Sequence, residues 1–386
     1  MKCSDVFKKI DEMNDAYLDV WEEVCNIESP TYDKEGVDAV GKYFIRRAGE
    51  RGWKIDICRQ LVSGDVVCIT MNPETDACPV SLSGHMDTVH PVGIFGTPAV
   101  RRDDKRIYGP GVKDCKGGIV AAFLAMDALW ECGFRSRPVQ LLLQSDEENS
   151  SMTSNKATIQ YICKQAEHAV AFLNLEGYTH GKTTLKRKGI ASYRFEVTGK
   201  ESHASRCATE GANAIAEAAH KIIALERLKD DTGITCSCGI IQGGAAVNTI
   251  AGKCSFSVNF RFADQKQLSW IREYVEEIAA ETHVPGCTCK VEQISLRVAM
   301  EVTEKNKKLL ERVNYIFAEN GLPTLEGRTV RGGSDGADVT AYGIPCLDSL
   351  GVIGSGTHSI DEYAELDSLA ASAKRLAAII YCIGNC

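Results

Sequence analysis

Short, largely apolar runs alternate with helical patterns through the first half of the chain, and this alternation limits the possible folds more than any other feature. The apolar runs cover residues 66–71, 80–83, 139–144 and 169–175, and a helical pattern covers 118–130. Such runs predict strands buried on both faces, as in a largely parallel sheet covered by helices. Because functional groups in these sheets gather at the carboxyl ends of the strands, the residues after each run are the first candidates for a site.

The pattern changes near residue 188. Residues 190–197 alternate between apolar and polar side chains, which is typical of a strand with one buried face. The same region is expected to form three more such strands and two helices: strands at 234–241, 254–262 and 289–296, and helices at 211–228 and 265–281. One-sided alternation indicates an antiparallel sheet with its helices on one face.

After residue 301 the first pattern returns, with a helix expected at 305–320 and a strand at 344–350. A length of 386 residues also favours two domains over a single core. We therefore expect an α/β catalytic domain formed by residues 1–188 and 301–386, with a mixed, largely parallel sheet and helices on both faces. A smaller α+β domain with an antiparallel sheet, residues 189–300, interrupts it.

Charge and hydropathy exclude several classes of function. The net charge is −8 at pH 7, from 44 Lys and Arg against 52 Asp and Glu, so the chain has no bulk basic face for nucleic acid. No run approaches the roughly 18–20 apolar residues of a membrane span. The N-terminus has no apolar stretch of signal-peptide length. We expect a soluble, cytoplasmic protein with neither a nucleic-acid nor a membrane partner.

Cysteine is unusually frequent, with 17 residues spread from Cys3 to Cys386. A chain of this length has a core of its own and does not need the disulfides of small secreted scaffolds. We expect reduced thiols that pack as small hydrophobic side chains. The two C-x-C pairs, at 236–238 and 287–289, lack the usual spacing of a structural zinc site, so packing is expected there too.

The first candidate site residues follow the run at 80–83, in the segment Ser-Gly-His85-Met-Asp87-Thr. His85 and Asp87 are two residues apart and lie on the same side of an extended chain. A metal-bound imidazole usually has a carboxylate or a carbonyl on its other ring nitrogen, so the pair suits a metal site. Taken alone, the pattern is more typical of a histidine that caps a turn. His90, nearby, has no ligand-like neighbours in the sequence.

Acidic residues follow the next elements. Asp114 lies in Gly-Pro-Gly-Val-Lys-Asp-Cys, where the backbone bends sharply before a helix, and the alternative role is an N-cap of that helix. Asp146, Glu147 and Glu148 follow the next apolar run, and three adjacent acids repel one another unless solvent or cations neutralise them. A solvated loop is the alternative. Adjacent carboxylates can also divide the work, one binding a metal and the other acting as general base.

Two further candidates complete a set of ligands. Glu176 follows the run at 169–175, and His358 lies in the loop Gly-Ser-Gly-Thr-His-Ser. Together the candidates supply two imidazoles and three carboxylates, with one acid to spare. This set suits two Zn²⁺ ions about 3.5–4 Å apart that share a carboxylate. The joint occurrence of these residues at strand ends, rather than any single motif, predicts the metal site.

These motifs resemble those of metallopeptidase family 20, the dinuclear zinc peptidases and amidohydrolases that include glutamate carboxypeptidase, aminoacylase, acetylornithine deacetylase and succinyl-diaminopimelate desuccinylase. The resemblance covers nearly the whole chain in the same order, inserted domain included. It rests on Ser-Gly-His-Met-Asp-Thr-Val, Gly-x-x-Asp-x-Lys-Gly-Gly, Asp-Glu-Glu and the closing Gly-x-x-x-His-Ser-x-x-Glu-Tyr.

The resemblance implies a role for each candidate ligand. His85 and Glu176 would hold one Zn²⁺, Glu148 and His358 would hold the other, and Asp114 would bridge the two. The same ligands also accept Co²⁺ or Mn²⁺.

The resemblance also implies roles for the residues beside the ligands. Asp87 would orient His85, and Glu147 would be the general base that takes a proton from water and delivers it to the leaving amine. A cis peptide bond is implied between Asp114 and Cys115. Cys115 departs from the residues familiar at this position, and we expect its thiol to pack rather than to react.

In the inserted domain the resemblance implies a second set of roles. His203, in Thr-Gly-Lys-Glu-Ser-His-Ala-Ser, matches a lid element whose histidine reaches the partner subunit's site and stabilises the oxyanion. A homodimer formed through residues 189–300 is therefore implied. Asn248 and Arg261 occupy the positions that bind the substrate carboxylate. Without the resemblance, His203 is typical of a turn and Arg261 of an exposed strand.

The loop Arg-Gly-Gly-Ser-Asp-Gly-Ala also matches the family, at a glycine-rich segment that borders the substrate. Its residues Gly332, Gly333 and Ser334 would offer backbone N–H groups to a carboxylate.

We therefore predict a dinuclear zinc amidohydrolase that releases a C-terminal amino acid from a small peptide or N-acyl amino acid, as a glutamate carboxypeptidase does. Residue 176 is a glutamate, Glu176, rather than an aspartate, and this choice fits the carboxypeptidase and deacylase branch of the family. An N-acyl-amino-acid deacylase of the aminoacylase or acetylornithine deacetylase type and a dipeptidase remain alternatives. A thiol hydrolase using Cys115 and a metal-free dimeric binding protein are alternatives of a different kind, and the complete ligand set argues against the second.

Overall fold

The computed structural model describes residues 2–230 and 233–384 of the chain. It divides into two compact units. Unit 1 contains 1–186, 302–329 and 334–386, and unit 2 contains 187–301 together with the short segment 330–333, which the sequence patterns do not reveal as part of the insert. No helix among the described residues is long and apolar enough to cross a membrane.

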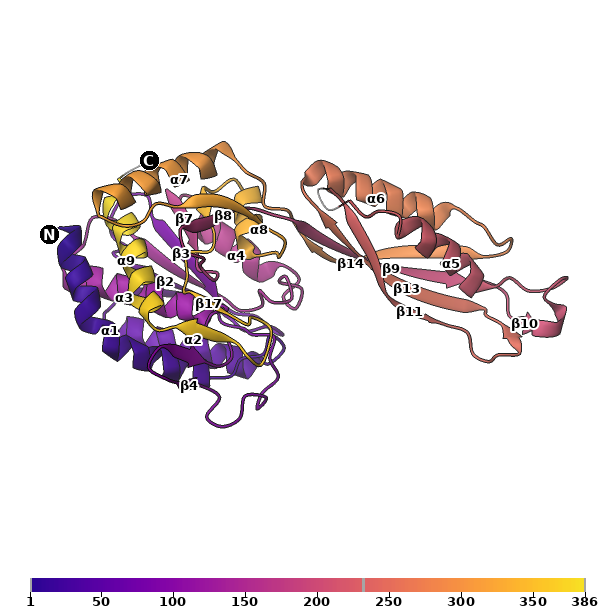
Figure 1. Cartoon of the computed structure of the whole chain (residues 1–386), viewed down its shortest axis with the longest axis horizontal. Coiled ribbons are helices and arrows are strands. Elements are labelled where there is room, and N and C mark those ends of the chain that lie inside the picture. Colours follow the sequence, from indigo (N-terminus) through magenta and orange to yellow (C-terminus); the bar gives the residue numbers. More distant parts are fainter. Residues whose placement is uncertain (1, 231–232, 385–386) are drawn as a thin grey trace. The chain divides into compact units, whose positions relative to one another are not determined.

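Unit 1 is built around a mixed six-stranded sheet with the strand order β1-β2-β6-β3-β7-β16 (Figure 1). Strands β6, β3, β7 and β16 run parallel, and β2 is antiparallel to both of its neighbours. This confirms the predicted fold class. The strands of the sheet are β1 (Lys54–Cys58), β2 (Val66–Met71), β3 (Val80–His85), β6 (Val139–Gln144), β7 (Ala171–Asn174) and β16 (Cys346–Leu347).

Alternate residues of these strands enter two different packing layers, because successive side chains of a strand point to opposite faces. Val67 and Ile69 of β2 join the main hydrophobic core, whereas Val66 and Cys68, which alternate with them, are buried outside it. Helices α1, α3 and α9 pack on one another in the main core, and α4 packs against α8. The helices are α1 (Cys3–Asn26), α2 (Lys34–Gly49), α3 (Lys116–Glu131), α4 (Ala157–Gln165), α7 (Glu304–Glu319), α8 (Asp335–Ala341) and α9 (Asp367–Cys382).

Short strands that the sequence patterns did not indicate form two further sheets in unit 1. One has the order β17-β18-β5-β4 and pairs Tyr363 of β18 with Tyr108 of β5. This pairing joins the loop that follows β5 to the loop between β17 and β18. These strands are β4 (Arg101–Arg102), β5 (Arg106–Tyr108), β17 (Gly354–Ser355) and β18 (Tyr363–Glu365), and the second sheet pairs β8 (Lys182–Arg187) with β15 (Glu326–Val330).

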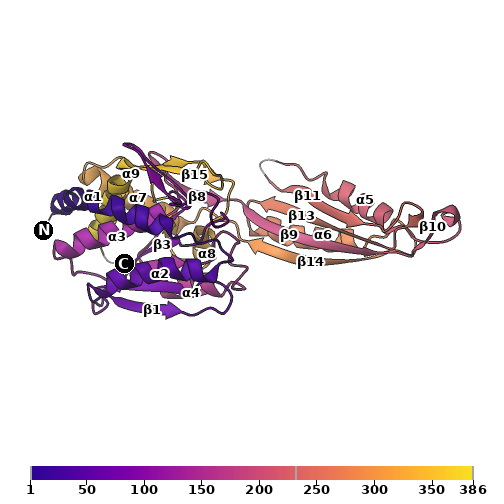
Figure 2. The ribbon, with the colours of Figure 1, turned by 90° about the horizontal axis from the view of Figure 1, so that it is seen from below.

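Unit 2 is an antiparallel four-stranded sheet, β11-β13-β9-β14, with helices α5 and α6 along one face (Figure 1), and Figure 2 shows its strands side by side. Phe195 of β9 and Phe256 of β13 are register partners and stack with ring centroids 4.7 Å apart on the buried face. The elements are β9 (Gly189–Thr198), β10 (Ser202–His203), α5 (Ala214–Leu225), β11 (Thr235–Gly243), β12 (Thr249–Ile250), β13 (Lys253–Phe262), α6 (Gln265–Ala280) and β14 (Thr288–Arg297), with a 3₁₀ turn at Ala204–Arg206.

Two element predictions differ from the structure in extent. The expected strand at 344–350 contains only Cys346–Leu347, because Asp348 pairs with Thr184 of β8 instead and Ser349 has a positive φ of 68°. The expected helix at 211–228 begins only at Ala214, because Asn213 caps it by accepting hydrogen bonds from the N–H groups of Ile215 and Ala216.

A buried ion pair joins the helices of unit 2. Lys221 Nζ of α5 lies 3.0 Å from Glu217 Oε1, and both side chains are almost fully buried. The Lys221 ammonium also donates to the carbonyl of Ile278 at the end of α6, at 2.7 Å. The Glu217 carboxylate accepts from the backbone N–H groups of His283 and Val284, at 2.9 and 2.7 Å. The pair therefore satisfies backbone groups that have no partner within α6 or the turn after it.

We expect Lys221→Met to lower the free energy of unfolding of unit 2 by about 3–5 kcal/mol, because it leaves a buried carboxylate uncompensated. The control is Lys229→Met, which removes the exposed pair with Glu226 and should cost less than about 1 kcal/mol. Urea unfolding combined with hydrogen exchange of β9 and β13 measures both values. Equal costs for the two variants would contradict this role of the pair.

Candidate metal centre

Four of the predicted site residues lie where the central strands of unit 1 end. His85 is the last residue of β3, Glu147 and Glu148 follow β6, and Glu176 follows β7. Since these three strands are parallel and adjacent, their carboxyl ends lie at one edge of the sheet. Buried parallel strands therefore bring the polar residues at and after their carboxyl ends to one edge of the sheet.

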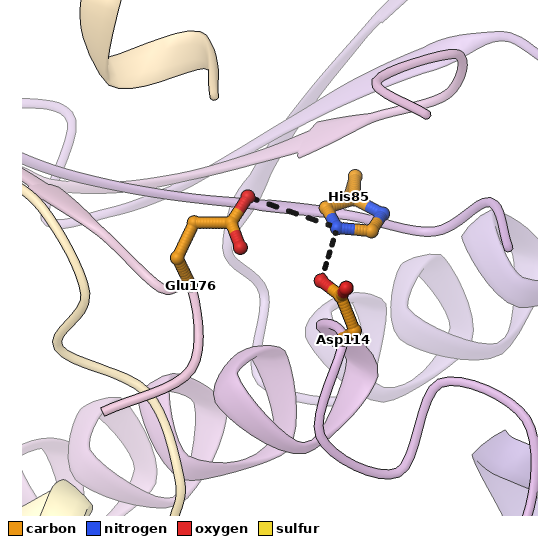
Figure 3. Close-up of side chains that lie close together, drawn as sticks. All are labelled: His85, Asp114 and Glu176. Atoms are coloured by element: carbon orange, nitrogen blue, oxygen red, sulfur yellow. Dashed lines mark hydrogen bonds and ion pairs between the residues drawn. The ribbon is translucent and has the colours of Figure 1, made fainter. Parts of the chain in front are cut away.

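The first group of potential ligands consists of His85, Asp114 and Glu176. His85 Nε2 lies 3.2 Å from Asp114 Oδ1 and 3.9 Å from Glu176 Oε1. Figure 3 shows both carboxylates directed at the same ring nitrogen, from two different loops. One imidazole nitrogen and two carboxylate oxygens thus converge on one point.

The second group consists of Asp114, Glu148 and His358. His358 Nε2 lies 3.3 Å from Asp114 Oδ2 and 3.1 Å from Glu148 Oε2. Asp114 is common to both groups and directs one carboxylate oxygen to each. His358 reaches the group from the loop between β17 and β18, where it has a positive φ of 63°.

The electrostatics of the second group show that the carboxylates of Asp114 and Glu148 attract positive charge. Burial alone would raise the pKa of Asp114, but hydrogen bonds from His358 and His85 outweigh burial and hold this pKa far below its usual range. Hydrogen bonds to Asp114 and Glu148 raise the pKa of His358 to about 10. Burial raises the pKa of Glu148 to about 7, although the hydrogen bond with His358 opposes this shift.

The ligand atoms of each group lie within 4.8 Å of one another, a spacing that suits a cation placed among them. Imidazole nitrogen and carboxylate oxygen are ligands that Zn²⁺ and similar divalent cations accept. A divalent cation in each group would neutralise the negative charge that the imidazoles otherwise balance. The residues present therefore fit two ions that share the carboxylate of Asp114.

Asp87 supports both groups. His85 Nδ1 lies 3.0 Å from the backbone carbonyl of Asp87 and 3.4 Å from its Oδ1. The Asp87 carboxylate also accepts the backbone N–H groups of Glu147 and Glu148, each at 3.1 Å, and the hydroxyl of Thr31 at 2.8 Å. Asp87 thus positions the acidic loop as well as His85. The sequence pattern identified only the contact with His85, and nothing in it pointed to Thr31.

The first acid of the Asp-Glu-Glu segment is used by its own loop. Asp146 is buried and accepts the N–H of Ser154 at 2.8 Å and the hydroxyl of Thr158 at 2.6 Å. These bonds connect the segment after β6 to the start of α4. The prediction gave Asp146 no role at the metal site, and its hydrogen-bond partners explain why it can be buried.

Glu362 holds the loop that carries Asp114. It is buried, and its carboxylate accepts the backbone N–H groups of Lys113 at 2.9 Å and of Asp114 at 3.1 Å. The N–H of Gly111 lies 3.3 Å from the same carboxylate, as does Nε2 of His90. Glu362 thereby joins the loop of His358 to that of Asp114. His90, which was expected to have no ligand-like neighbours, contacts the acid Glu362 but belongs to neither group of potential ligands.

Cys115 lies against the first group. The peptide bond between Asp114 and Cys115 is cis, as the family resemblance implied. Cys115 Sγ accepts the backbone N–H of His85 at 3.0 Å. Burial raises the pKa of Cys115 to about 12, so its thiol stays protonated at neutral pH and is a poor nucleophile. These observations argue against a thiol hydrolase.

The predicted residues of unit 2 lie near the two ends of β13, with His203 and Asn248 at the separate β10-β12 pair before its start. His203 of β10 pairs with Thr249 of β12, and the carbonyl of Asn248 accepts the N–H of Ala204 at 2.9 Å. His203 and Asn248 are therefore neighbours, and both are exposed.

Arg261 lies near the other end of β13, in the four-stranded sheet. It pairs with Ile190, where the chain enters β9, and is partly buried. At about 3.3 Å per residue, the length of β13 from Lys253 to Arg261 is about 26 Å. The structure therefore does not bring Asn248 and Arg261 together within one chain.

The glycine-rich loop is held from both sides. The Arg187 guanidinium donates to the carbonyls of Gly332 and Gly333, at 3.1 and 3.2 Å. Ser334 is fully buried, and its hydroxyl donates to Asp348 Oδ2 at 2.5 Å and accepts the N–H of Gly336 at the start of α8. The hydroxyl of Ser334 therefore serves the fold.

Comparison with known proteins agrees with the class of enzyme that this site defines. The family described as "Peptidase family M20/M25/M40" matches residues 81–381, and the chain belongs to it. It is therefore a hydrolase of peptide or amide bonds in a metal-dependent family.

Individual relatives extend over most of the chain. Carboxypeptidase G2 of a Pseudomonas species is 29% identical over 378 residues, which cover 96% of this chain and 89% of the relative. A succinyl-diaminopimelate desuccinylase of Cereibacter sphaeroides is 28% identical over 322 residues, covering 76% and 81%. The crystal structure of an aminopeptidase from Bacillus cereus superimposes with a TM-score of 0.76 at 19% identity, covering 95% of this chain and 98% of that one.

We expect Glu362→Gln to weaken the binding of Zn²⁺ by about 10–100-fold, because an amide cannot accept all of the N–H groups that orient the Asp114 loop. Glu365→Gln, three residues along and only partly buried, is the matched control and should bind as the wild type does. Competition with a chromogenic chelator measures both affinities. Wild-type affinity in Glu362→Gln would show that the carboxylate has no part in positioning Asp114.

Proposed function

We propose that the chain is a dinuclear zinc-dependent carboxypeptidase that hydrolyses the amide bond to a C-terminal amino acid. The observation that carries the proposal is the pair of ligand groups that share Asp114. The full-length similarity to a carboxypeptidase supports the choice of activity within the family. Glu176, rather than an aspartate, supports the same branch.

When bound, the two cations would supply the positive charge that activates water and polarises the scissile carbonyl. His85 and Glu176 would hold one ion, Glu148 and His358 the other, and Asp114 both. Zn²⁺ is the proposed ion because it takes this mixture of nitrogen and oxygen ligands, and Co²⁺ or Mn²⁺ would suit the same set.

Glu147 is the proposed general base. It is buried beside the ligand Glu148, and its backbone N–H is held by the Asp87 carboxylate at 3.1 Å. A carboxylate fixed next to the ions takes a proton from the attacking water and then protonates the leaving amine. By contacting both residues, Asp87 fixes the position of Glu147 relative to His85.

We propose that the enzyme works as a homodimer through unit 2. His203 would act as a donor to the oxyanion in the partner's site, and Asn248 and Arg261 would bind the substrate carboxylate. The backbone of Gly332, Gly333 and Ser334 would border it. The separation of Asn248 from Arg261 along β13 supports this arrangement. Two residues near opposite ends of one strand can serve one substrate if they come from different subunits.

We also propose a cytoplasmic location, because 15 of the described cysteines, among them Cys25, Cys68 and Cys236, have free thiols that a reducing compartment preserves. Cys78 is disulfide-bonded and departs from the expectation that the thiols are reduced.

We expect Glu147→Gln to lower kcat by about 10²–10⁴-fold while leaving the metal content unchanged, because the amide cannot accept the proton. The substrates are a panel of N-acyl amino acids, dipeptides and pteroyl-type glutamates, with released amino acid as the readout. Asp361→Asn, an exposed residue near His358, is the control and should keep wild-type turnover. Undiminished kcat in Glu147→Gln would remove Glu147 from the mechanism.

The same panel separates the alternatives. Release of the C-terminal residue from varied acyl donors supports a carboxypeptidase, and activity confined to short acyl groups indicates a deacylase. Activity confined to unblocked dipeptides indicates a dipeptidase.

The shared site predicts complementation between two inactive variants. His203→Ala and Glu147→Gln homodimers should each be nearly inactive. An equimolar mixture that has exchanged subunits should recover about a quarter of wild-type activity, because half of the dimers then contain one intact site. Activity that stays at the level of the parents after subunit exchange, verified by mass spectrometry, would place His203 outside the partner's site.

A further inference from the structure

A cavity of unit 1, lined by none of the candidate metal ligands, lies between the N-terminal helix α1 and the C-terminal helix α9. Its volume is about 630 Å³, within the range of small-molecule sites. Its walls are largely apolar and come from α9, from the segment after β7 and from the segment after α7. They include Ala370, Ala371, Ile353, Leu322, Pro323 and Tyr178.

Arg375 of α9 is a buried cation that lines this cavity. Its side chain is only 6% exposed and packs on the ring of Tyr178, with 3.8 Å between the guanidinium carbon and the ring centroid. Its Nη2 donates to the carbonyl of Gly351 at 3.1 Å, and its buried Nε has no hydrogen-bond partner among the described residues. Burial lowers the pKa of Arg375 to about 10, which reflects a charge without a compensating acid.

The acids around the cavity do not neutralise Arg375. Asp11 pairs with Lys374 Nζ at 2.6 Å, so this acid and base at the rim compensate one another. Asp367 is exposed at the start of α9 and forms no ion pair with Arg375 among the described residues. A buried guanidinium is costly unless it is paired, and the space beside it is open to a ligand.

Asn14 of α1 supplies a second polar group to the same cavity. Its Oδ1 is buried and has no hydrogen-bond donor among the described residues. An acceptor of this kind is satisfied by an N–H or O–H group of a ligand. One cation, one free acceptor and apolar walls together define a small set of possible ligands.

We propose that this cavity binds an organic carboxylate with an apolar body and a hydrogen-bond donor, its carboxylate on Arg375 and its donor on Asn14. The site is distinct from the metal centre, but two successive hydrogen bonds connect Arg375 to the backbone of the candidate ligand Glu176. Arg375 holds the carbonyl of Gly351, whose own N–H donates to the carbonyl of Glu176 at 2.9 Å.

Isothermal titration of the metal-loaded enzyme with 3-(4-hydroxyphenyl)propionate tests the proposal. We expect saturable binding that is at least about tenfold weaker in Arg375→Met, because a charge-assisted hydrogen bond contributes roughly 1.5–3 kcal/mol. Ala371→Phe, which keeps the guanidinium but fills the cavity, should also lose binding. This variant keeps the test decisive if Arg375→Met folds poorly.

Two controls separate the cavity from the active site. The uncharged analogue 3-(4-hydroxyphenyl)propan-1-ol should bind at least about tenfold more weakly, and Arg261→Met should bind the carboxylate as the wild type does. The proposal is overturned if the wild type shows no saturable binding, if the alcohol binds equally well, or if Ala371→Phe binds normally. Loss of binding in Arg261→Met alone would place the carboxylate in the active site.

Discussion

The carboxylate of Asp114 is the point on which the rest of the site depends. One of its oxygens faces His85 and the other faces His358, at 3.2 and 3.3 Å, and each imidazole shares a second acid with it. A single short side chain can serve two groups only if its backbone is held firmly. Glu362 supplies this restraint by accepting the N–H of Asp114 and of the residue before it.

The parallel sheet explains why so much negative charge can gather at one edge. The strands are buried almost throughout, and the candidate site residues lie at the last residue of β3 or just after β6 and β7. The like-charged side chains would repel one another. Two features offset this repulsion: backbone N–H groups, which Asp87 and Asp146 accept, and the positive charge of imidazoles or divalent cations among the ligands.

The sequence was sufficient to predict the parts of the molecule that depend on local pattern. The strands at 66–71 and 139–144 appear within their expected limits, and the antiparallel sheet of the insert follows from its one-sided alternation. The five candidate ligands converge because each one follows an apolar run or lies in a glycine-rich loop. The short strands β5 and β18 were not predicted, since three residues are too few to show the alternation of apolar and polar side chains.

Other features depend on contacts between distant residues, which one sequence does not reveal. Glu362 and His90 are 272 residues apart, and neither has a local signal for the pair that they form. Thr31 reaches Asp87 across 56 residues. Arg375 lies in a helix with an ordinary apolar pattern, and only the fold shows that no acid among residues 2–230 and 233–384 forms an ion pair with it. The backbone N–H of Ser334 was predicted to face a substrate carboxylate, whereas the bond of its hydroxyl to Asp348, which belongs to another segment, was not predicted.

The most direct test of the shared carboxylate is anomalous diffraction from crystals of the zinc-loaded protein, with data collected above and below the zinc absorption edge. The account predicts two anomalous peaks per chain, roughly 3.5–4 Å apart, with one oxygen of Asp114 directed at each. A single peak, or a pair of peaks of which only one contacts Asp114, would contradict it.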